Sequence, residues 1–172
     1  VIWLVNSNNG SLTRIDQGNW RYHWDMPQFR ISWSPDSQWL TYSRAGENRN
    51  QSIYVFNVRA QQLDQLTSGF YSDFDPVFDP SGNYIAAIGY RSFQPTFGDI
   101  DSTFTYTGSM LVSILPLTSS VGAPGDIAWQ APAATEKVAI DFQDAESRLR
   151  TLPFPAGHFS SIAFTDDKLS VV

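Results

Sequence analysis

The sequence predicts an all-β fold, a partial β-propeller of about two to three four-stranded antiparallel blades. Two kinds of hairpin each occur twice, in the same order, at spacings of 45 and 51 residues. One hairpin of each kind gives four strands in roughly 45 to 50 residues, which is the size of a propeller blade. The alternative is a β-sandwich with two similar hairpins, but a sandwich gives no reason for both kinds to recur in order.

The first kind of hairpin is built around Trp33 and, 45 residues later, around Phe78. In each copy an aromatic residue ends one strand, and a polar turn that contains proline follows it. Proline and the small polar residues beside it favour a tight turn, after which a second strand begins. These second strands are predicted over residues 39–43 and 84–88.

The second kind of hairpin aligns residues 2–6 with residues 53–57 at an offset of 51. Each copy has a strand that ends in asparagine, a turn, and a short strand that closes with glycine. The matching positions after the turn are Leu12, Ile15 and Gly18 in the first copy and Leu63, Leu66 and Gly69 in the second. The two kinds of hairpin are therefore the inner and outer halves of one repeating unit.

These matches divide the chain into five parts. Residues 1–17 are the outer strands of a preceding blade, 18–68 form a blade, 69–118 form a blade with an insertion near 92–107, 119–137 form a linker or an irregular excursion, and 138–172 begin a further blade. Strands at both ends are typical of a chain cut from a longer polypeptide, and we expect this chain to be such a fragment.

Two of these boundaries depend on where individual strands are placed. In the blade over 69–118 the third strand, residues 110–115, aligns with residues 53–58 at an offset of 57, which leaves 12 extra residues before it. In the last part, strands are predicted over residues 138–142, 148–152 and 160–172, with a degenerate copy of the polar turn at 165–168.

The composition excludes several classes of partner. The chain has 17 acidic against 11 basic residues, so it lacks the positive field that nucleic-acid binding needs. No apolar run approaches the roughly 18 residues of a spanning helix, and we expect no membrane insertion. The absence of cysteine is compatible with both a cytoplasmic and a periplasmic location.

The insertion is the candidate recognition loop, because long loops on a rigid scaffold often carry binding. It is rich in aromatic side chains and has two carboxylates. The candidate residues are Phe93, Phe97, Asp99, Asp101, Phe104 and Tyr106. The alternative is a hairpin whose aromatic residues pack only on one another.

Neither catalytic nor cofactor chemistry is expected. Only His23 and His158 could serve a serine nucleophile as base, and neither lies in a suggestive motif. The acidic residues Asp73, Asp75 and Asp79 could offer oxygens to calcium, but their spacing is not that of an EF-hand. We favour structural roles for them, at the entrance to an inner strand and in the turn that follows it.

Residues 33–36 and 39–43 resemble the WD40-like PD40 repeat that TolB and the tricorn protease family share. The longer run over 66–82, followed by Tyr90-Arg91, by residues 140–142 with Arg148, and by Leu152-Pro153, resembles the propeller region of tricorn-type peptidases. Ser37 and Gly89 depart from the usual pattern, where glycine and a small polar residue are common.

The resemblance implies a large serine peptidase whose propellers admit peptides to a separate catalytic domain. No residue of this chain matches the nucleophile or the base of that family. The leading hypothesis is therefore a non-catalytic propeller fragment that scaffolds and gates peptide access. The alternative is a TolB-like protein-interaction propeller with no associated peptidase.

The expected partners are a peptide or protein and the remainder of the parent polypeptide. Each blade buries its faces on its neighbours, so a few blades alone leave apolar faces uncovered. We therefore also expect self-association through the open blade faces.

Overall fold

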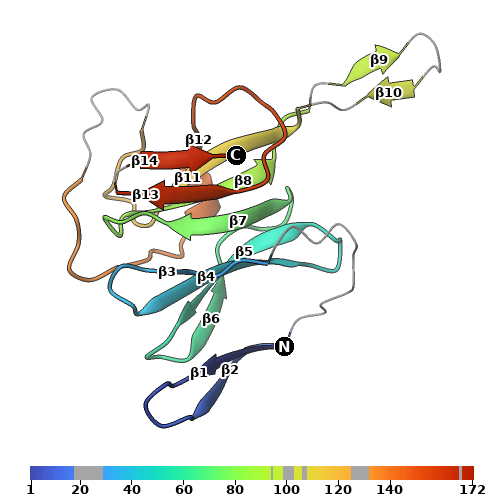
Figure 1. The fold of residues 1–172 in the computed structure, drawn as a ribbon. Coiled ribbons are helices and arrows are strands. Elements are labelled where there is room, and N and C mark those ends of the chain that lie inside the picture. The colour runs from blue at the N-terminus through green and yellow to red at the C-terminus, as the bar shows by residue number, and fades with distance from the viewer. Residues whose placement is uncertain (18–28, 94, 99–102, 106–107, 125–131, 167) are drawn as a thin grey trace.

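The computed structural model describes residues 1–17, 29–93, 95–98, 103–105, 108–124, 132–166 and 168–172. In these residues the fold is all-β apart from one 3-10 turn, Ala145–Arg148 (Figure 1). None of the described residues forms a helix long and apolar enough to cross a membrane. The predicted fold class, a partial propeller of antiparallel blades, is confirmed.

The first blade is a four-stranded meander in the order β3-β4-β5-β6. Its strands are β3 (Ser32–Trp33), β4 (Trp39–Ala45), β5 (Gln51–Asn57) and β6 (Gln62–Gln65). The second blade has the order β7-β8-β11-β12, from β7 (Asp73–Phe78), β8 (Tyr84–Tyr90), β11 (Met110–Pro116) and β12 (Arg150–Thr151). Between β8 and β11, the strands β9 (Thr96–Gly98) and β10 (Thr103–Thr105) form a hairpin of their own.

Two-stranded sheets flank the two blades. The first comprises β1 (Ile2–Val5) and β2 (Leu12–Asp16), and the second comprises β13 (Ile162–Thr165) and β14 (Lys168–Val171). The strands β3, β7 and β13, each first in its sheet, lie side by side in chain order (Figure 1). We call these three the inner strands.

The strand register reproduces both sequence repeats. Trp33 pairs with Leu40, and Phe78 pairs with Ile85, so the first repeat keeps its offset of 45 in both strands of the hairpin. Trp3 pairs with Arg14 as Tyr54 pairs with Gln65, and this second repeat keeps its offset of 51. The β1–β2 hairpin is thus the same outer half-blade as β5–β6.

The predicted alignment of the third strands was wrong by two residues. In the first blade Leu40 pairs with Phe56, and its equivalent Ile85 pairs with Leu115. Residue 115 therefore corresponds to residue 56, an offset of 59 (115 minus 56) rather than 57. A shift of two keeps every side chain on its own face of the sheet, so the alternation of apolar residues could not reveal it.

The end of the second blade was also misassigned. Residues 138–142 form no strand, and Arg150–Thr151, expected in a further blade, pairs with β11 as the fourth strand of the second blade. This blade thus extends beyond residue 118. Residues 132–149 instead form a strap, whose Val138 N–H donates to Asp36 Oδ2 at 2.8 Å and whose Thr135 N–H donates to the Ser81 carbonyl at 2.8 Å. The strap therefore joins the polar turns of both blades.

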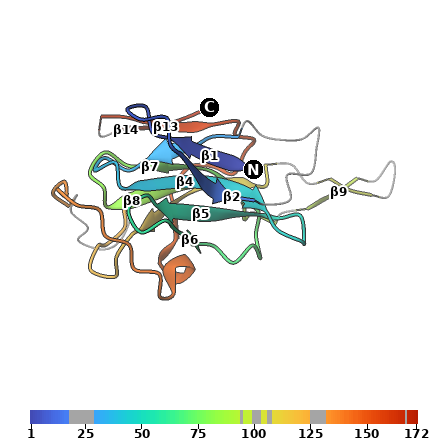
Figure 2. The ribbon, with the colours of Figure 1, turned by 90° about the horizontal axis from the view of Figure 1, so that it is seen from below.

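Apolar side chains fill the spaces between successive sheets. Ile53 and Val55 of the first blade meet Ile85 and Ala87 of the second, and Val138 of the strap joins the same cluster. Figure 2 shows β1–β2 lying over the first blade, where Ile2 and Leu4 pack on a cluster that includes Leu40, Tyr42 and Phe56. Leu169 and Val171 of β14 pack in turn on the far face of the second blade.

Candidate functional site

The insertion after β8 forms a hairpin that projects away from the blades (Figures 1 and 2). Phe97 on β9 and Phe104 on β10 lie opposite each other and meet edge to face, with ring centroids 5.5 Å apart. Both rings are nonetheless more than half exposed, and Phe93 at the base is 78% exposed. The other candidate recognition residues, Asp99, Asp101 and Tyr106, lie outside the described residues.

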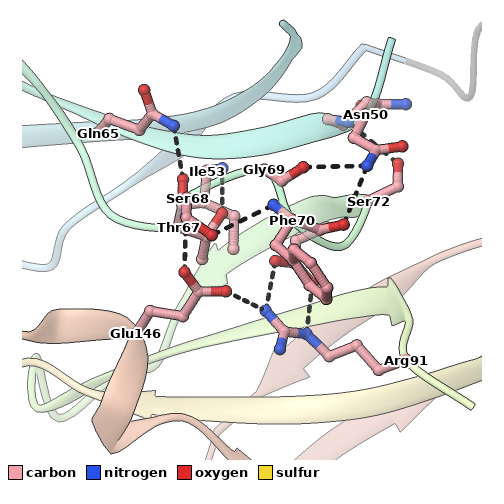
Figure 3. A network of polar contacts seen from close by, with 12 residues as sticks. Asn50, Ile53, Gln65, Thr67, Ser68, Gly69, Phe70, Ser72, Arg91 and Glu146 are labelled. Atoms are coloured by element: carbon pink, nitrogen blue, oxygen red, sulfur yellow. Dashed lines mark hydrogen bonds and ion pairs between the residues drawn. The ribbon is translucent and has the colours of Figure 1, made fainter. Parts of the chain in front are cut away.

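The base of this hairpin is held by a buried ion cluster around Arg91, the residue after β8 (Figure 3). The Arg91 guanidinium donates to both carboxylate oxygens of Asp73, at 2.7 and 2.6 Å, and to Glu146 Oε1 at 3.0 Å. Glu146 Oε2 accepts the Ser68 backbone N–H at 2.7 Å. The guanidinium also lies 4.7 Å from the ring centroid of Tyr71, close enough for a cation–π contact.

The Arg91 cluster connects three separate parts of the chain: an inner strand, the connection between the blades, and the strap. Burial lowers the pKa of Arg91, but the hydrogen bonds and charges of Asp73 and Glu146 outweigh it, and the pKa is raised above its usual value. Burial raises the pKa of Glu146, yet its bonds from Ser68 and Arg91 bring that pKa below its usual value. Arg91 and Glu146 are therefore both charged at neutral pH, and their ion pair joins the end of β8 to the strap.

Hydrogen bonds from the first blade fix the connection between the blades, residues 66–72 (Figure 3). Asn50 Nδ2 donates to the carbonyls of Gly69 and Phe70, at 3.0 and 3.1 Å. The Ile53 N–H donates to Thr67 Oγ1 at 3.0 Å. Gly69 has φ +79°, and a Cβ there would lie 2.7 Å from Ser52 Oγ, so this turn requires glycine.

Gly89 leaves room for the Asp73 carboxylate, which explains its departure from the usual repeat pattern. A Cβ at this position would overlap Asp73 Oδ1 and lie 3.3 Å from the Arg91 side chain. We expect Gly89→Ala to lower the free energy of unfolding by about 2 to 3 kcal/mol in urea denaturation, because the carboxylate must move away from Arg91.

The control for this prediction is Gly10→Ala, where an added Cβ meets nothing within 4 Å. That change costs only the strain of a positive φ, about 1 kcal/mol. Equal losses for the two variants would contradict the steric role of Gly89.

The three aspartates considered as calcium ligands have separate partners. Asp73 binds Arg91, and Asp79 accepts the backbone N–H groups of Asn83 and Tyr84, at 2.9 and 2.7 Å, within its turn. Asp75 lies in a bulge of β7 with φ +51°. In the described part of the chain no group of three or more acidic or histidine side chains could hold a metal ion.

Asp75 links the three inner strands. Its Oδ2 accepts the Ile162 N–H of β13 at 2.9 Å, and its Oδ1 lies 3.6 Å from Arg30 Nε, just before β3. The pKa of Asp75 is raised above its usual value. Burial raises it, and this effect outweighs the lowering by the Ile162 N–H and by the Arg30 charge.

The inner strands enclose a groove of about 470 Å³. Its walls come from residues 30–33 and 35, 76–80, and 162–164. Trp33 and Ile31 are 46% and 41% exposed there, so the groove has apolar walls with Arg30 among them. From the sequence, Trp33 and Phe78 were expected only as the ends of strands in the repeated hairpins, and no groove was predicted between these strands.

His158 does not line this groove. His158 Nε2 accepts the Gly108 N–H at 3.4 Å, at the base of the projecting hairpin. His23 lies outside the described residues.

Comparison with known proteins points to one group of peptidases. No protein-family model matches the chain. A protein of Sulfurisphaera tokodaii named as a tricorn-like protease C-terminal subunit is 24% identical over 155 residues, which are 90% of this chain and 17% of that protein. The tricorn protease of Thermoplasma volcanium is 26% identical over 72% of this chain and 12% of its own length.

A solved structure agrees with the sequence comparison. The crystal structure of the tricorn protease matches 93% of this chain with a TM-score of 0.74 and 20% sequence identity. The chain has the fold of part of a tricorn protease. It spans about a sixth of the length of that protein, since it covers 16% of the solved chain.

Proposed function

We propose that this chain is a non-catalytic propeller segment of a tricorn-like serine peptidase. In this role it scaffolds the enzyme and controls the access of peptides to a catalytic domain elsewhere. The observation that supports the proposal is the groove between the inner strands, which is lined by three successive sheets. The relatives of the chain are named as tricorn proteases.

The groove suits an extended peptide better than a compact metabolite. Its walls are edge strands with the exposed apolar side chains of Ile31 and Trp33, which offer backbone groups and side-chain contacts along a line. Trp33 is the largest exposed side chain in these walls, and buried tryptophan contacts dominate many binding interfaces. Trp33 is therefore the residue whose loss should weaken peptide binding most.

The test is the binding of fluorescein-labelled peptides from a tryptic digest of casein, followed by fluorescence anisotropy. We expect saturable binding, and we expect Trp33→Ala to weaken it about tenfold, since that corresponds to about 1.4 kcal/mol of contact free energy. Phe70→Ala is the matched control, because Phe70 is 77% exposed in the connection between the blades, outside the groove. An absence of saturable binding, or equal effects of the two changes, would refute the role of the groove.

A further inference from the structure

Asp75 is a buried carboxylate with one oxygen that is not hydrogen-bonded. Its side chain is only 5% exposed, and its Oδ2 accepts the Ile162 N–H at 2.9 Å. Its Oδ1, by contrast, accepts no hydrogen bond from any described residue. Arg30 Nε lies 3.6 Å from this oxygen, which is beyond hydrogen-bond distance. Because buried polar groups are nearly always hydrogen-bonded, this oxygen requires an explanation.

The backbone holds Asp75 in place at a cost in free energy. Its φ of +51° lies in the left-handed region, which most residues with a Cβ avoid. It also lies in the bulge of β7 between Phe74 and Val77, and bulges beside functional sites commonly re-aim a side chain. Burial of the charged form is a further cost, and it raises the pKa of Asp75. Backbone strain and an unsatisfied buried charge at one residue favour a functional role.

The neighbours of Asp75 line the groove between the inner strands. The next residue, Pro76, is in the groove wall, and so are the two residues that contact the carboxylate, Ile162 and Arg30. The strand β7 has a described sheet on each side, because β3 and β13 both lie against it. The Arg30 side chain is 37% exposed. We therefore expect a movement of this side chain to open Asp75 Oδ1 to a ligand in the groove.

The other charges of the groove are already balanced. Its walls contain two charged residues, Arg30 and Asp79. Asp79 Oδ1 accepts the N–H groups of Asn83 and Tyr84, at 2.9 and 2.7 Å. Asp79 Oδ2 accepts the Ser81 N–H at 3.0 Å. The carboxylate with capacity for a further donor is therefore that of Asp75.

We propose that Asp75 binds a positively charged group of the peptide in the groove, so that the groove prefers peptides with such a group. The group is an ammonium or a guanidinium, from a lysine or arginine side chain or from the amino terminus. This inference rests on the proposed function, because it names the class of peptide that the groove takes.

The exchange of Arg30 for the ligand is favourable on energetic grounds. An ion pair with a partly exposed partner, and without a hydrogen bond, contributes little to stability. A hydrogen bond from a cation to a buried carboxylate contributes several times more, and it also satisfies Asp75 Oδ1. The free energy spent on burying and straining Asp75 is thus recovered when the peptide binds.

The test compares four heptapeptides of valine and serine that carry fluorescein at the carboxyl terminus and differ at one central residue. Three have an acetylated amino terminus and carry lysine, norleucine or glutamate at the centre. The fourth carries norleucine and has a free amino terminus. In fluorescence anisotropy we expect at least one of the two cationic peptides to bind about tenfold more tightly than the acetylated norleucine peptide. The tighter of the two shows whether the side chain or the amino terminus supplies the cation.

The variant that tests the residue is Asp75→Asn. It removes the charge with little change of shape, and asparagine is among the residues that tolerate a positive φ. It should reduce the affinity for the cationic peptide to that for the acetylated norleucine peptide. Asp64→Asn is the matched control, because Asp64 accepts Gln62 Nε2 at 2.9 Å on β6, outside the groove. This control should keep the preference.

Urea denaturation of the same variants distinguishes a ligand-binding role from a structural one. Without a ligand the buried charge of Asp75 is unfavourable, so we expect Asp75→Asn to leave the urea midpoint unchanged or to raise it. A clearly lower midpoint would show that the carboxylate serves to hold the inner strands together, and it would overturn the proposal.

The binding results separate this inference from the proposed function. Equal, saturable binding of all four peptides overturns the inference but leaves the groove as a peptide site. An absence of saturable binding by any of the four overturns both. A preference for the glutamate peptide would assign recognition to Arg30 and overturn the role of Asp75. A cation preference that persists in Asp75→Asn overturns it as well.

Discussion

Replacing Arg91 by methionine is expected to lower the free energy of unfolding by about 3 to 5 kcal/mol. The change leaves the Asp73 carboxylate, whose side chain is only 2% exposed, without the guanidinium that binds both of its oxygens. A buried charge without a partner costs far more than the net contribution of the pair itself. The measurement is urea denaturation followed by circular dichroism, at constant pH and salt concentration.

The matched control is Arg14→Met. Arg14 bonds Gln17 at 2.7 Å on the exposed surface of the β1–β2 hairpin, so its loss should change stability by no more than about 0.5 kcal/mol.

A double-mutant cycle that combines Arg91→Met with Asp73→Asn separates the Arg91–Asp73 pair from the rest of the Arg91 cluster. The double variant should be more stable than the sum of the single losses predicts, because the uncharged amide no longer needs a cation. Strict additivity would show that Arg91 and Asp73 are not coupled.

Much of the fold could be predicted because the repeats carry two signals at once. Around Trp33 and Phe78 the polar turn fixes where the chain reverses, and the apolar alternation fixes which side chains are buried. Together they determined the hairpins, their order and their pairing. For the third strand of the second blade only the alternation was available, because the insertion takes the place of a tight turn. The register predicted for this strand was therefore wrong by two residues.

The strap shows why alternation alone can mislead. Val138 is buried, Ala139 is exposed and Ile140 is partly buried, as in a strand. The Val138 N–H bonds the Asp36 side chain rather than a neighbouring strand, because the segment fills a space between blades. A strand over residues 148–152 was predicted, but its place as the fourth strand of the second blade was not, since Arg150 and Thr151 are both exposed and the strand is only two residues long.

The groove and the Arg91 cluster illustrate a further limit of the sequence. Both are assembled from residues that lie far apart in the chain, such as Ser68, Arg91 and Glu146. No local pattern brings these residues together. The aromatic insertion, by contrast, was found because it interrupts a repeat, and its role in recognition stays a prediction.

Loss of the Arg148 side chain is expected to give the second large effect on stability. Arg148 donates to the carbonyls of Gln143 at 2.7 Å, Pro116 at 3.1 Å and Leu117 at 3.4 Å, and also to the carbonyl of Asp141. Its side chain is only 14% exposed. Arg148→Ala removes the donor from four carbonyls, two of which belong to the buried residues Pro116 and Leu117, so we expect a loss of about 3 kcal/mol in unfolding free energy.

Loss of Arg148 should also affect the strap before the rest of the molecule. Hydrogen exchange measured by mass spectrometry should show faster exchange over residues 132–149 and unchanged exchange in β4 and β5, since these strands are held by their own ladder. Arg150→Ala is the control, because Arg150 is exposed and donates to the nearby carbonyls of Ser147 and Leu149. It should cost no more than about 0.5 kcal/mol. If Arg148→Ala left exchange of the strap unchanged, its packing between the blades alone would hold it, and the carbonyl contacts would be incidental.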